Sequence, residues 1–335
     1  MATIITEAIN ANFAFADNPI IVKATDLNFE TGSIFRQVIF EVFTFYNGGA
    51  STERSFTFAV NVDDGATSVE CDISSALRST FAQYKYNADA VTSTGTITYP
   101  FVTYVMSIKT REMIDGVAKD SAPTYQPPLN EDKGYTGAYK SFLGGLSDME
   151  RWKDSSTINC KDTPNFTTKP TGEILDRGQL IATSTHDATN RVVKTQFSTA
   201  QSGVLDTRDR TTILFVNSRG VFDTISVVGY ESEEYAVSAE VRSLVGGTSY
   251  RPSPYVTTHK EGGGASWKMS SGWVNREWAQ WFAREFLMAK HYWMPKDGRW
   301  LPVAITPDSD SIVTYDKNDP SLLAVNFTAT AAIKG

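Results

Sequence analysis

The chain has 335 residues, of which 41% are hydrophobic and 21% charged, and this length allows two or three domains that fold without disulfides or metals. Its net charge is −7 and its basic residues are scattered, so it lacks the basic stripe that neutralises a nucleic-acid backbone, and direct nucleic-acid binding is not expected. No stretch is long and apolar enough to span a membrane, and the N-terminus lacks a secretory signal pattern. We therefore expect no membrane insertion, synthesis in a cytoplasm, and two reduced cysteines, Cys71 and Cys160.

Strand signals dominate the first third of the chain. Phe, Tyr, Thr and Ser recur, and from Ile34 onward apolar and polar residues alternate in runs that are separated by turn residues at 47–49 and 63–65. These runs predict a three-stranded antiparallel meander. A later run of the same kind completes a predicted N-terminal β domain over residues 1–112.

A short helix is predicted after the meander, at residues 74–81. Ser74 or Ser75 is expected to cap it, because a serine side chain accepts a hydrogen bond from a free backbone N–H at the start of a helix. The helix is expected to bury Ala76, Leu77 and Phe81.

Residues 113–172 differ from the rest of the chain. They are rich in Pro, Asn, Thr and Gly and show no sustained period, which is typical of a connecting or extended loop segment. Tyrosines and prolines in a long loop favour contact with a partner. Two alternatives are open: a loop that neighbouring subunits order, or an ordinary connector between domains.

Residues 173–335 predict a second β domain. Two apolar runs meet at residues 217–220, where Asn217 and Gly220 tolerate the left-handed backbone of a tight hairpin corner. The three glycines at 262–264 lack the spacing and the Lys-Ser/Thr ending of a phosphate-binding loop, so we interpret them as a mobile turn. The last strand is predicted in LLAVNFTATAAI.

One longer amphipathic helix is predicted at residues 274–292 of this domain. At about 100° per residue, its apolar side chains share one arc, as in a helix packed on a sheet. The arc comprises Val274, Trp278, Trp281, Phe282, Phe286, Met288, Ala289 and Tyr292. Glu285 lies within it, and we expect a carboxylate satisfied by an Arg or a sheet edge rather than a catalytic acid. The chain as a whole is predicted to be mainly β, with two antiparallel β-sandwich or barrel-like domains, a few short helices and this longer one.

Residues for catalysis or metal binding are sparse. His186, His259 and His291 lie outside GxSxG, HExxH and Cys-His patterns. The acidic tracts at 63–64 and 307–311 lack the glycine and glutamate spacing of a calcium-binding EF-hand loop. We therefore expect no enzyme activity, no cofactor and no metal site.

Four stretches carry a resemblance to a known family. They are FVNSRGVFDTISVVG, MSSGWVNREWAQWFAREFLMAKHYW, GRWLPVAITPDSDSIVTYDKNDPSLLAVNFTATAAI and, near the N-terminus, VECDISSALRSTF. They resemble structural proteins from the tails, necks or baseplates of phages and prophages of gut Bacteroidales, including crAss-like phages. The resemblance implies a non-enzymatic virion building block of β-sandwich or barrel-like domains, made in the host cytoplasm. Its copies are expected to join one another and other virion proteins in a ring or collar.

Subunit contacts in a ring are heterologous, because one patch meets a different patch on the next copy. Aromatic residues in the middle tract and near the glycines are the candidates for such contacts, and Arg219 at the hairpin corner joins them. The candidate interface residues are Tyr125, Tyr135, Tyr139, Phe142, Trp152, Arg219, Tyr250, Tyr255 and Trp267. For the aromatic residues, packing in a core is an equally open alternative.

An alternative function is a carbohydrate- or receptor-binding β module of a phage tail. Sugar rings stack on exposed aromatic faces, and four tryptophans gather toward the C-terminus. They are Trp267, Trp273, Trp293 and Trp300. Three of the four lie beside or within the packed helix and strand patterns, which favours a core role and makes glycan the less favoured partner.

Overall fold

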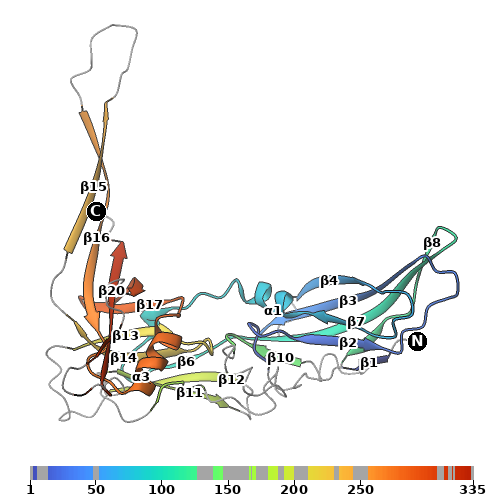
Figure 1. Cartoon of the computed structure of the whole chain (residues 1–335), viewed down its shortest axis with the longest axis horizontal. Coiled ribbons are helices and arrows are strands. Elements are labelled where there is room, and N and C mark those ends of the chain that lie inside the picture. The colour runs from blue at the N-terminus through green and yellow to red at the C-terminus, as the bar shows by residue number, and fades with distance from the viewer. Residues whose placement is uncertain are drawn as a thin grey trace, which may run out of the picture.

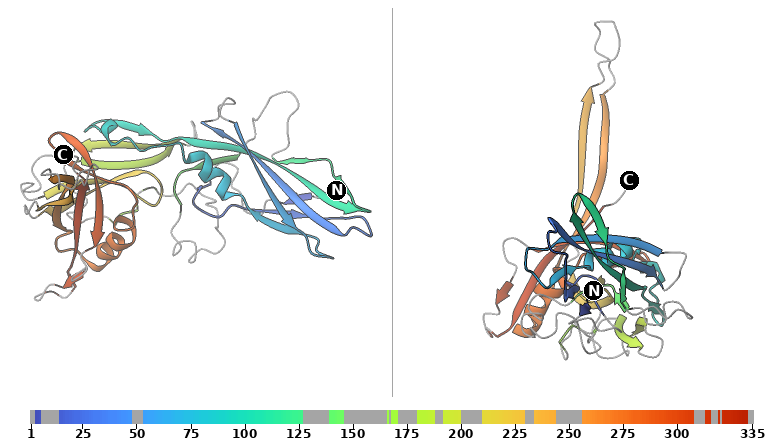
Figure 2. Two further views of the ribbon diagram at one scale, coloured as in Figure 1. Left: turned by 90° about the horizontal axis from the view of Figure 1, so that it is seen from above. Right: turned by 90° about the vertical axis from the view of Figure 1, so that its right-hand side faces the viewer.

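The computed structural model describes residues 3–5, 14–47, 53–126, 139–145, 166, 168–170, 180–187, 192–199, 210–229, 234–243, 256–307, 313–315, 319 and 321–332. These residues form a mainly β protein with short helices, which confirms the predicted fold class. The molecule is elongated, with a β-sandwich at one end and a β-barrel at the other (Figure 1). A two-stranded arm stands out from the barrel end, as the end-on view of Figure 2 also shows.

Two antiparallel sheets form the N-terminal sandwich. The smaller sheet contains β1 (Thr3–Ile5), β2 (Ile21–Thr25) and β5 (Val69–Asp72), in the order β1-β2-β5. The larger sheet contains β3 (Phe35–Tyr46), β4 (Glu53–Asn61), β7 (Phe101–Ile114), β8 (Val117–Asp120), β9 (Thr124–Gln126) and β10 (Tyr139–Phe142). Its main path is β10-β7-β3-β4, and β8 and β9 pair with β7 as well.

The predicted meander is confirmed for its first two strands and wrong for its third. β3 and β4 pair in one continuous antiparallel register, from Phe45 opposite Glu53 to Gln37 opposite Asn61. β5 leaves this sheet and pairs with β2. Among the described residues, no strand therefore covers the outer edge of β4.

The helix α1 (Ser74–Phe81) lies where the sequence predicts it and buries its three predicted apolar residues. The predicted serine cap is wrong. Asp72 instead accepts hydrogen bonds from the backbone N–H groups of Ser74 (2.9 Å) and Ile20 (3.0 Å). One carboxylate thus starts the helix and fixes the residue before β2.

The inner faces of the two sheets and α1 enclose the N-terminal core. Its buried members from β3 and β7 are Val38, Phe40, Val42, Val102, Tyr104, Met106 and Ile108. Cys71 is a free thiol in this core, as expected, and burial followed by the negative charge of Asp72 raises its pKa to about 11. Cys160 lies outside the described residues.

The middle tract is only partly a loop. β8, β9 and β10 all lie within residues 113–172, and all three pair with β7. β7 itself runs to Ile114, past the predicted boundary at 112. The prediction of a connecting loop is therefore wrong for these strands, because strands of three or four residues are too short to show a period.

The C-terminal domain contains a closed six-stranded barrel. Its strands are β13 (Arg210–Val216), β14 (Phe222–Gly229), β16 (Val256–Ser270), β17 (Tyr292–Lys296), β18 (Arg299–Pro307) and β20 (Leu323–Ala332). They follow the order β16-β14-β13-β17-β18-β20, and pairing of β20 with β16 closes the barrel. β15 (Glu234–Ser243) pairs with β16, and β19 (Val313–Tyr315) pairs with β20.

The amphipathic helix is shorter than predicted. α3 (Arg276–Trp281) starts at Asn275, whose side chain accepts a backbone N–H of the first turn, and it continues as the π-helical turn η4 (Phe282–Phe286). Its buried side chains share the barrel core with β13, β14, β16 and β20, and they are Trp278, Ala279, Trp281, Phe282 and Phe286. Met288 is exposed and Tyr292 begins β17, so the helix prediction is wrong beyond the π turn.

The glycine-rich segment is a strand rather than a mobile turn. Residues 262–264 lie in the middle of β16. The register with β15 shifts there, because Ala236 lies opposite Gly264 whereas Ser238 lies opposite Glu261. Two glycines therefore face a single residue of β15, which is the arrangement of a β-bulge, and glycine suits the extra backbone residue.

A third sheet joins the two ends of the molecule. β6 (Thr96–Thr98) pairs with β12 (Val192–Thr199), which pairs with β11 (Leu180–Asp187). A core formed with the barrel strands β13 and β14 contains Phe15, Ala88 of the 3-10 turn η2 (Ala88–Ala90), Tyr99, Phe142, Phe166, Phe197, Leu214 and Phe222. The two predicted β domains therefore share one interior at their junction.

Candidate functional site

The corner between β13 and β14 lies at the junction of the two domains. The two strands pair in an unbroken antiparallel register, and residues 217–220 form the turn, as the sequence predicts. Gly220 has a φ of 72°, and the side-chain oxygen of Asn217 accepts the N–H of Arg219 (3.0 Å). Left-handed backbone and an Asx-type bond are what a short corner requires.

Arg219 connects this corner to the segment that follows β10. Its side chain is buried, and Nη1 donates to the carbonyl of Gly145 (3.0 Å). In return, the N–H of Gly145 donates to the carbonyl of Ser218 (2.8 Å). The guanidinium carbon lies 5.9 Å from the ring centroid of Phe15, within range of a cation–π contact. The arginine therefore binds its own chain rather than projecting from it.

Two tyrosines hold the corner from the N-terminal side. The hydroxyl of Tyr86 donates to the carbonyl of Gly220 (2.9 Å), and the hydroxyl of Tyr99 accepts the N–H of Phe222 (2.7 Å). Burial raises the pKa of both phenols well above the usual range. Both hydroxyls therefore stay neutral and serve as fixed hydrogen-bonding groups.

A buried ion pair lies beside the corner. Lys169 Nζ is 3.0 Å from Asp223 Oδ1, and both side chains are 4% exposed. The same ammonium donates to the carbonyl of Thr224 (3.0 Å), and Asp223 Oδ1 also accepts the N–H of Thr224 (2.8 Å). Because each charge is both paired and hydrogen-bonded, the pair is tolerated in the interior and ties residues 168–170 to β14.

An open cavity of about 240 Å³ borders the junction, and Tyr86, Ser218, Glu285 and His291 are among the residues that line it. Glu285 Oε2 accepts the N–H of Ser218 (3.2 Å), so the carboxylate is hydrogen-bonded to the hairpin corner, whereas the sequence predicts an Arg or a sheet edge as its partner. Ser, His and Glu are the residue types of a hydrolase triad. In the described part of the chain, however, the Ser218 hydroxyl makes no hydrogen bond, and the His291 ring stacks on Trp293 at 6.1 Å.

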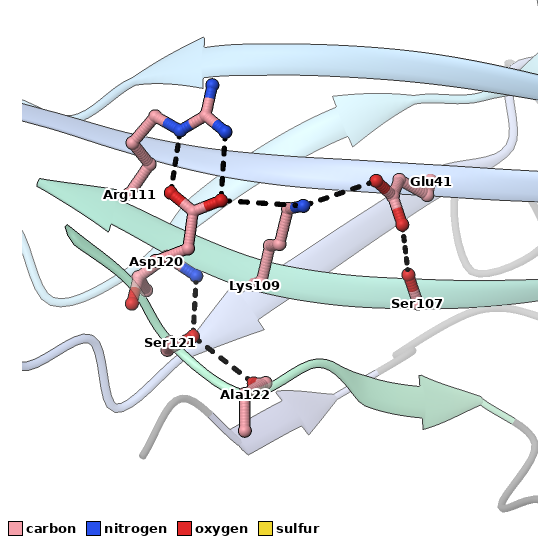
Figure 3. Close-up of polar contacts among 8 residues, drawn as sticks. Glu41, Ser107, Lys109, Arg111, Asp120, Ser121 and Ala122 are labelled. Atoms are coloured by element: carbon pink, nitrogen blue, oxygen red, sulfur yellow. Dashed lines mark hydrogen bonds and ion pairs between the residues drawn. The ribbon is translucent and has the colours of Figure 1, made fainter. Parts of the chain in front are cut away.

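A network of charges crosses the outer face of the larger sheet (Figure 3). Arg111 Nε and Nη2 donate to the two oxygens of Asp120 at 2.7 and 2.8 Å. Lys109 lies between Asp120 (3.5 Å) and Glu41 (3.4 Å), and Ser107 donates to Glu41 (2.9 Å). Each carboxylate thus faces a cation, so the network fastens β8 to β7 and β3 rather than offering a pair of free carboxylates.

An Asp120→Asn variant is expected to lose less than about 1 kcal/mol of unfolding free energy at neutral pH, because the pair is open to solvent. The hydrogen bond and charge of Arg111 lower the pKa of Asp120. Its stabilisation is therefore present above the unfolded-state pKa of about 3.9 and is lost as the pH falls through the lower folded-state value. Urea denaturation of both proteins at neutral and acid pH measures this, and a difference that does not shrink in acid contradicts the assignment.

The far end of the sandwich exposes an apolar tip, formed by Ile34, Phe35 and Val117. Their exposed fractions are 78%, 39% and 61%. Phe35 pairs with Met113, and Val117 pairs with Ile114 across the β7–β8 turn, so the three residues lie at one end of the sheet. Because exposed apolar groups gather there, the tip is a candidate contact surface.

The structure describes five of the nine predicted interface residues. Tyr139, Phe142, Arg219 and Trp267 are buried within their own chain, in the sandwich core, the shared core, the corner and the barrel core. In this conformation they offer no surface to a neighbouring copy. Tyr125 in β9 is exposed and retains that role as a prediction. Outside the described residues lie Tyr135, Trp152, Tyr250 and Tyr255.

The described residues show no group of three or more His, Cys, Asp or Glu side chains that would hold a metal ion. Asp64 in the first acidic tract pairs with Arg36, and residues 308–311 of the second tract lie outside the described residues. No helix in the described segments has the length and hydropathy of a bilayer-spanning helix. Comparison of the chain with protein-family models, curated proteins and solved structures finds no match.

Sequence reasoning identifies the corner but not its partners. Lys169, Gly144 and Gly145 lie in the tract that shows no period, and they meet the corner across more than 50 residues of chain. The glycine pair was the available signal, since adjacent glycines allow a close approach of two backbones. No sequence pattern marks the free outer edge of β4. Alternation predicts β5 as a strand, but it does not predict that β5 pairs with β2 instead of β4.

Proposed function

We propose that this chain is a non-enzymatic structural subunit of a phage virion, whose copies assemble into a ring or collar of the tail, neck or baseplate. The observation that carries the proposal is the arm, defined as residues 238–243 of β15 and 256–261 of β16. Within the described part of the chain, these residues pair only with one another, beyond the point where β16 joins the barrel, and the arm projects from the body (Figure 1). A two-stranded ribbon is marginally stable alone, so such an arm suits packing on another subunit.

The positions of the exposed surfaces support the same function. The arm projects from the barrel end of the molecule. β8, which carries part of the apolar tip, lies on the sandwich at the opposite end of the molecule (Figure 1). Two different surfaces at opposite ends favour heterologous contacts, which form a ring when the rotation between copies closes. The sequence resemblance to phage tail, neck and baseplate proteins supports the virion setting.

The glycan-binding alternative rests on one tryptophan. Trp273 is 50% exposed, whereas Trp267 is buried, and Trp293 and Trp300 pack against the shared core. A single exposed ring offers a small stacking platform compared with the arm.

The test is the mass distribution of the full chain across concentration, by native mass spectrometry, together with negative-stain electron microscopy. We expect a closed oligomer, and we expect the chain among the proteins of purified phage particles. A chain that stays monomeric at every concentration and is missing from particles contradicts the proposal. Glycan binding that a Trp273→Ala variant abolishes supports the alternative instead.

A further inference from the structure

The outer edge of β4 is an uncovered strand edge of unusual length. β4 has nine residues, shows no proline and no register shift, and among the described strands pairs only with β3. Charges are confined to its first two residues, Glu53 and Arg54. Natural proteins normally protect such edges with prolines, bulges or charges, because unpaired N–H and C=O groups recruit another strand. Most of β4 therefore lacks the features that prevent pairing with another strand.

The side chains of β4 leave the N-terminal core partly open at this edge. Phe56, Phe58 and Val60 are only half-buried against the core, and the residues between them are exposed. An additional strand beside β4 would remove apolar area from water and pair its free backbone groups at the same time.

The arm also ends in an edge strand, β15, which could pair with such an edge. Of the strands that the structure describes, β16 alone pairs with β15, so the other backbone edge of β15 has no described partner along its ten residues. The part of β16 beyond its pairing with β20 covers residues 256–263, which at ~3.3 Å per residue extends roughly 25 Å. Its reach is comparable to the length of β4. The arm and β4 lie toward opposite ends of the molecule, so the arm cannot reach the β4 of its own chain (Figure 1).

We propose that the outer edge of β4 receives the arm of a second copy of this chain, so that β15 of one subunit extends the larger sheet of the next. The inference rests on the proposed function and specifies its subunit contact. This contact is heterologous, because the arm of each copy binds one neighbouring copy and its β4 edge binds the arm of another. Pairing of β4 with β4 would be isologous and would end at a dimer.

Disulfide mapping tests the contact directly. Two differently tagged copies each carry one added cysteine, Ala59→Cys on β4 in one and Glu240→Cys on β15 in the other. Both also carry Cys160→Ser, and the native Cys71 stays buried in the core. Ser238→Cys and Arg242→Cys sample other registers, because a disulfide requires Cα atoms within about 7 Å. The matched control is Thr185→Cys on β11, which is also exposed and also at the end of its sheet. We expect cross-links between β4 and the arm and none with β11.

A second pair of variants tests the energetics without cysteine chemistry. Thr57→Lys with Ala59→Lys places charges at two exposed positions of β4, which leaves the fold intact and is expected to weaken self-association at least about tenfold. Thr183→Lys with Thr185→Lys on β11 is expected to have no effect.

The outcomes separate this inference from the proposed function. Closed oligomers without β4–arm cross-links, or with equal cross-linking of β11, overturn the contact and leave the subunit function standing. Cross-links between two β4 strands overturn the heterologous geometry. A chain that is monomeric throughout and gives no cross-link overturns both.

Discussion

Replacement of Lys169 with methionine is expected to lower the free energy of unfolding by about 3–5 kcal/mol, because the carboxylate of Asp223 then stays buried without its cation. The expected loss exceeds the strength of the ion pair itself. Both side chains are 4% exposed, so water cannot replace the ammonium unless the structure opens. Chemical denaturation, followed by the tryptophan fluorescence of the barrel, measures the change.

Two comparisons show whether burial is the cause. The exposed pair Lys119–Glu30 has nearly the same length (3.1 Å), and Lys119→Met is expected to cost less than about 1 kcal/mol. The double variant Lys169→Met with Asp223→Asn removes both charges and keeps an acceptor for the N–H of Thr224. It is expected to recover much of the lost stability. Equal losses for Lys169→Met and Lys119→Met would show that the interior pair is effectively solvated.

The elements that the sequence predicts well are those whose signal is local. Alternation and turn residues predict β3, β4 and the β13–β14 hairpin, and an apolar spacing predicts α1. Apolar spacing is a poor guide where it continues from a helix into a strand. The apolar arc from Val274 to Tyr292 spans a helix, a π turn and the start of β17, and nothing in residue spacing marks where one ends. The glycines at 262–264 fail for a different reason, since glycine serves a bulge within a strand as well as it serves a turn.

Strand partners and the junction were beyond sequence reasoning because they depend on distant contacts. β5 follows β4 in the chain and shows strand alternation, yet it completes the smaller sheet with β2. That choice uncovers the edge of β4, which the proposed subunit contact uses. Similarly, the polar turn predicts that Arg219 contacts a neighbouring subunit, whereas Gly145, 74 residues earlier, supplies its carbonyl partner. A polar turn in sequence is therefore no evidence of an exposed turn once a second domain packs on it.

The junction itself is expected to depend on the absence of a side chain at Gly144. Its φ is +85°, and a Cβ there would lie 2.1 Å from the carbonyl carbon of Arg219 and 2.4 Å from the nitrogen of Gly220. Backbone atoms cannot move aside as a flexible side chain can. A Gly144→Ala variant combines the left-handed backbone penalty of about 1–2 kcal/mol with an overpacking penalty of about 1–3 kcal/mol, so a loss of about 2–5 kcal/mol is expected.

Gly116→Ala is the matched control, because Gly116 has a φ of +78° and open space where the Cβ would be. It is expected to show the backbone penalty alone, so the difference between the two variants isolates the contact between the β10 segment and the hairpin corner. Denaturation gives both free energies, and small-angle scattering of Gly144→Ala reports whether the two domains have separated while each stays folded. A loss no greater than that of Gly116→Ala would mean that the two backbones are not in close contact. A greater loss with intact domains would show that the buried corner fixes the sandwich and the barrel as one body, which is the geometry that sets the arm and the β4 edge at their distance.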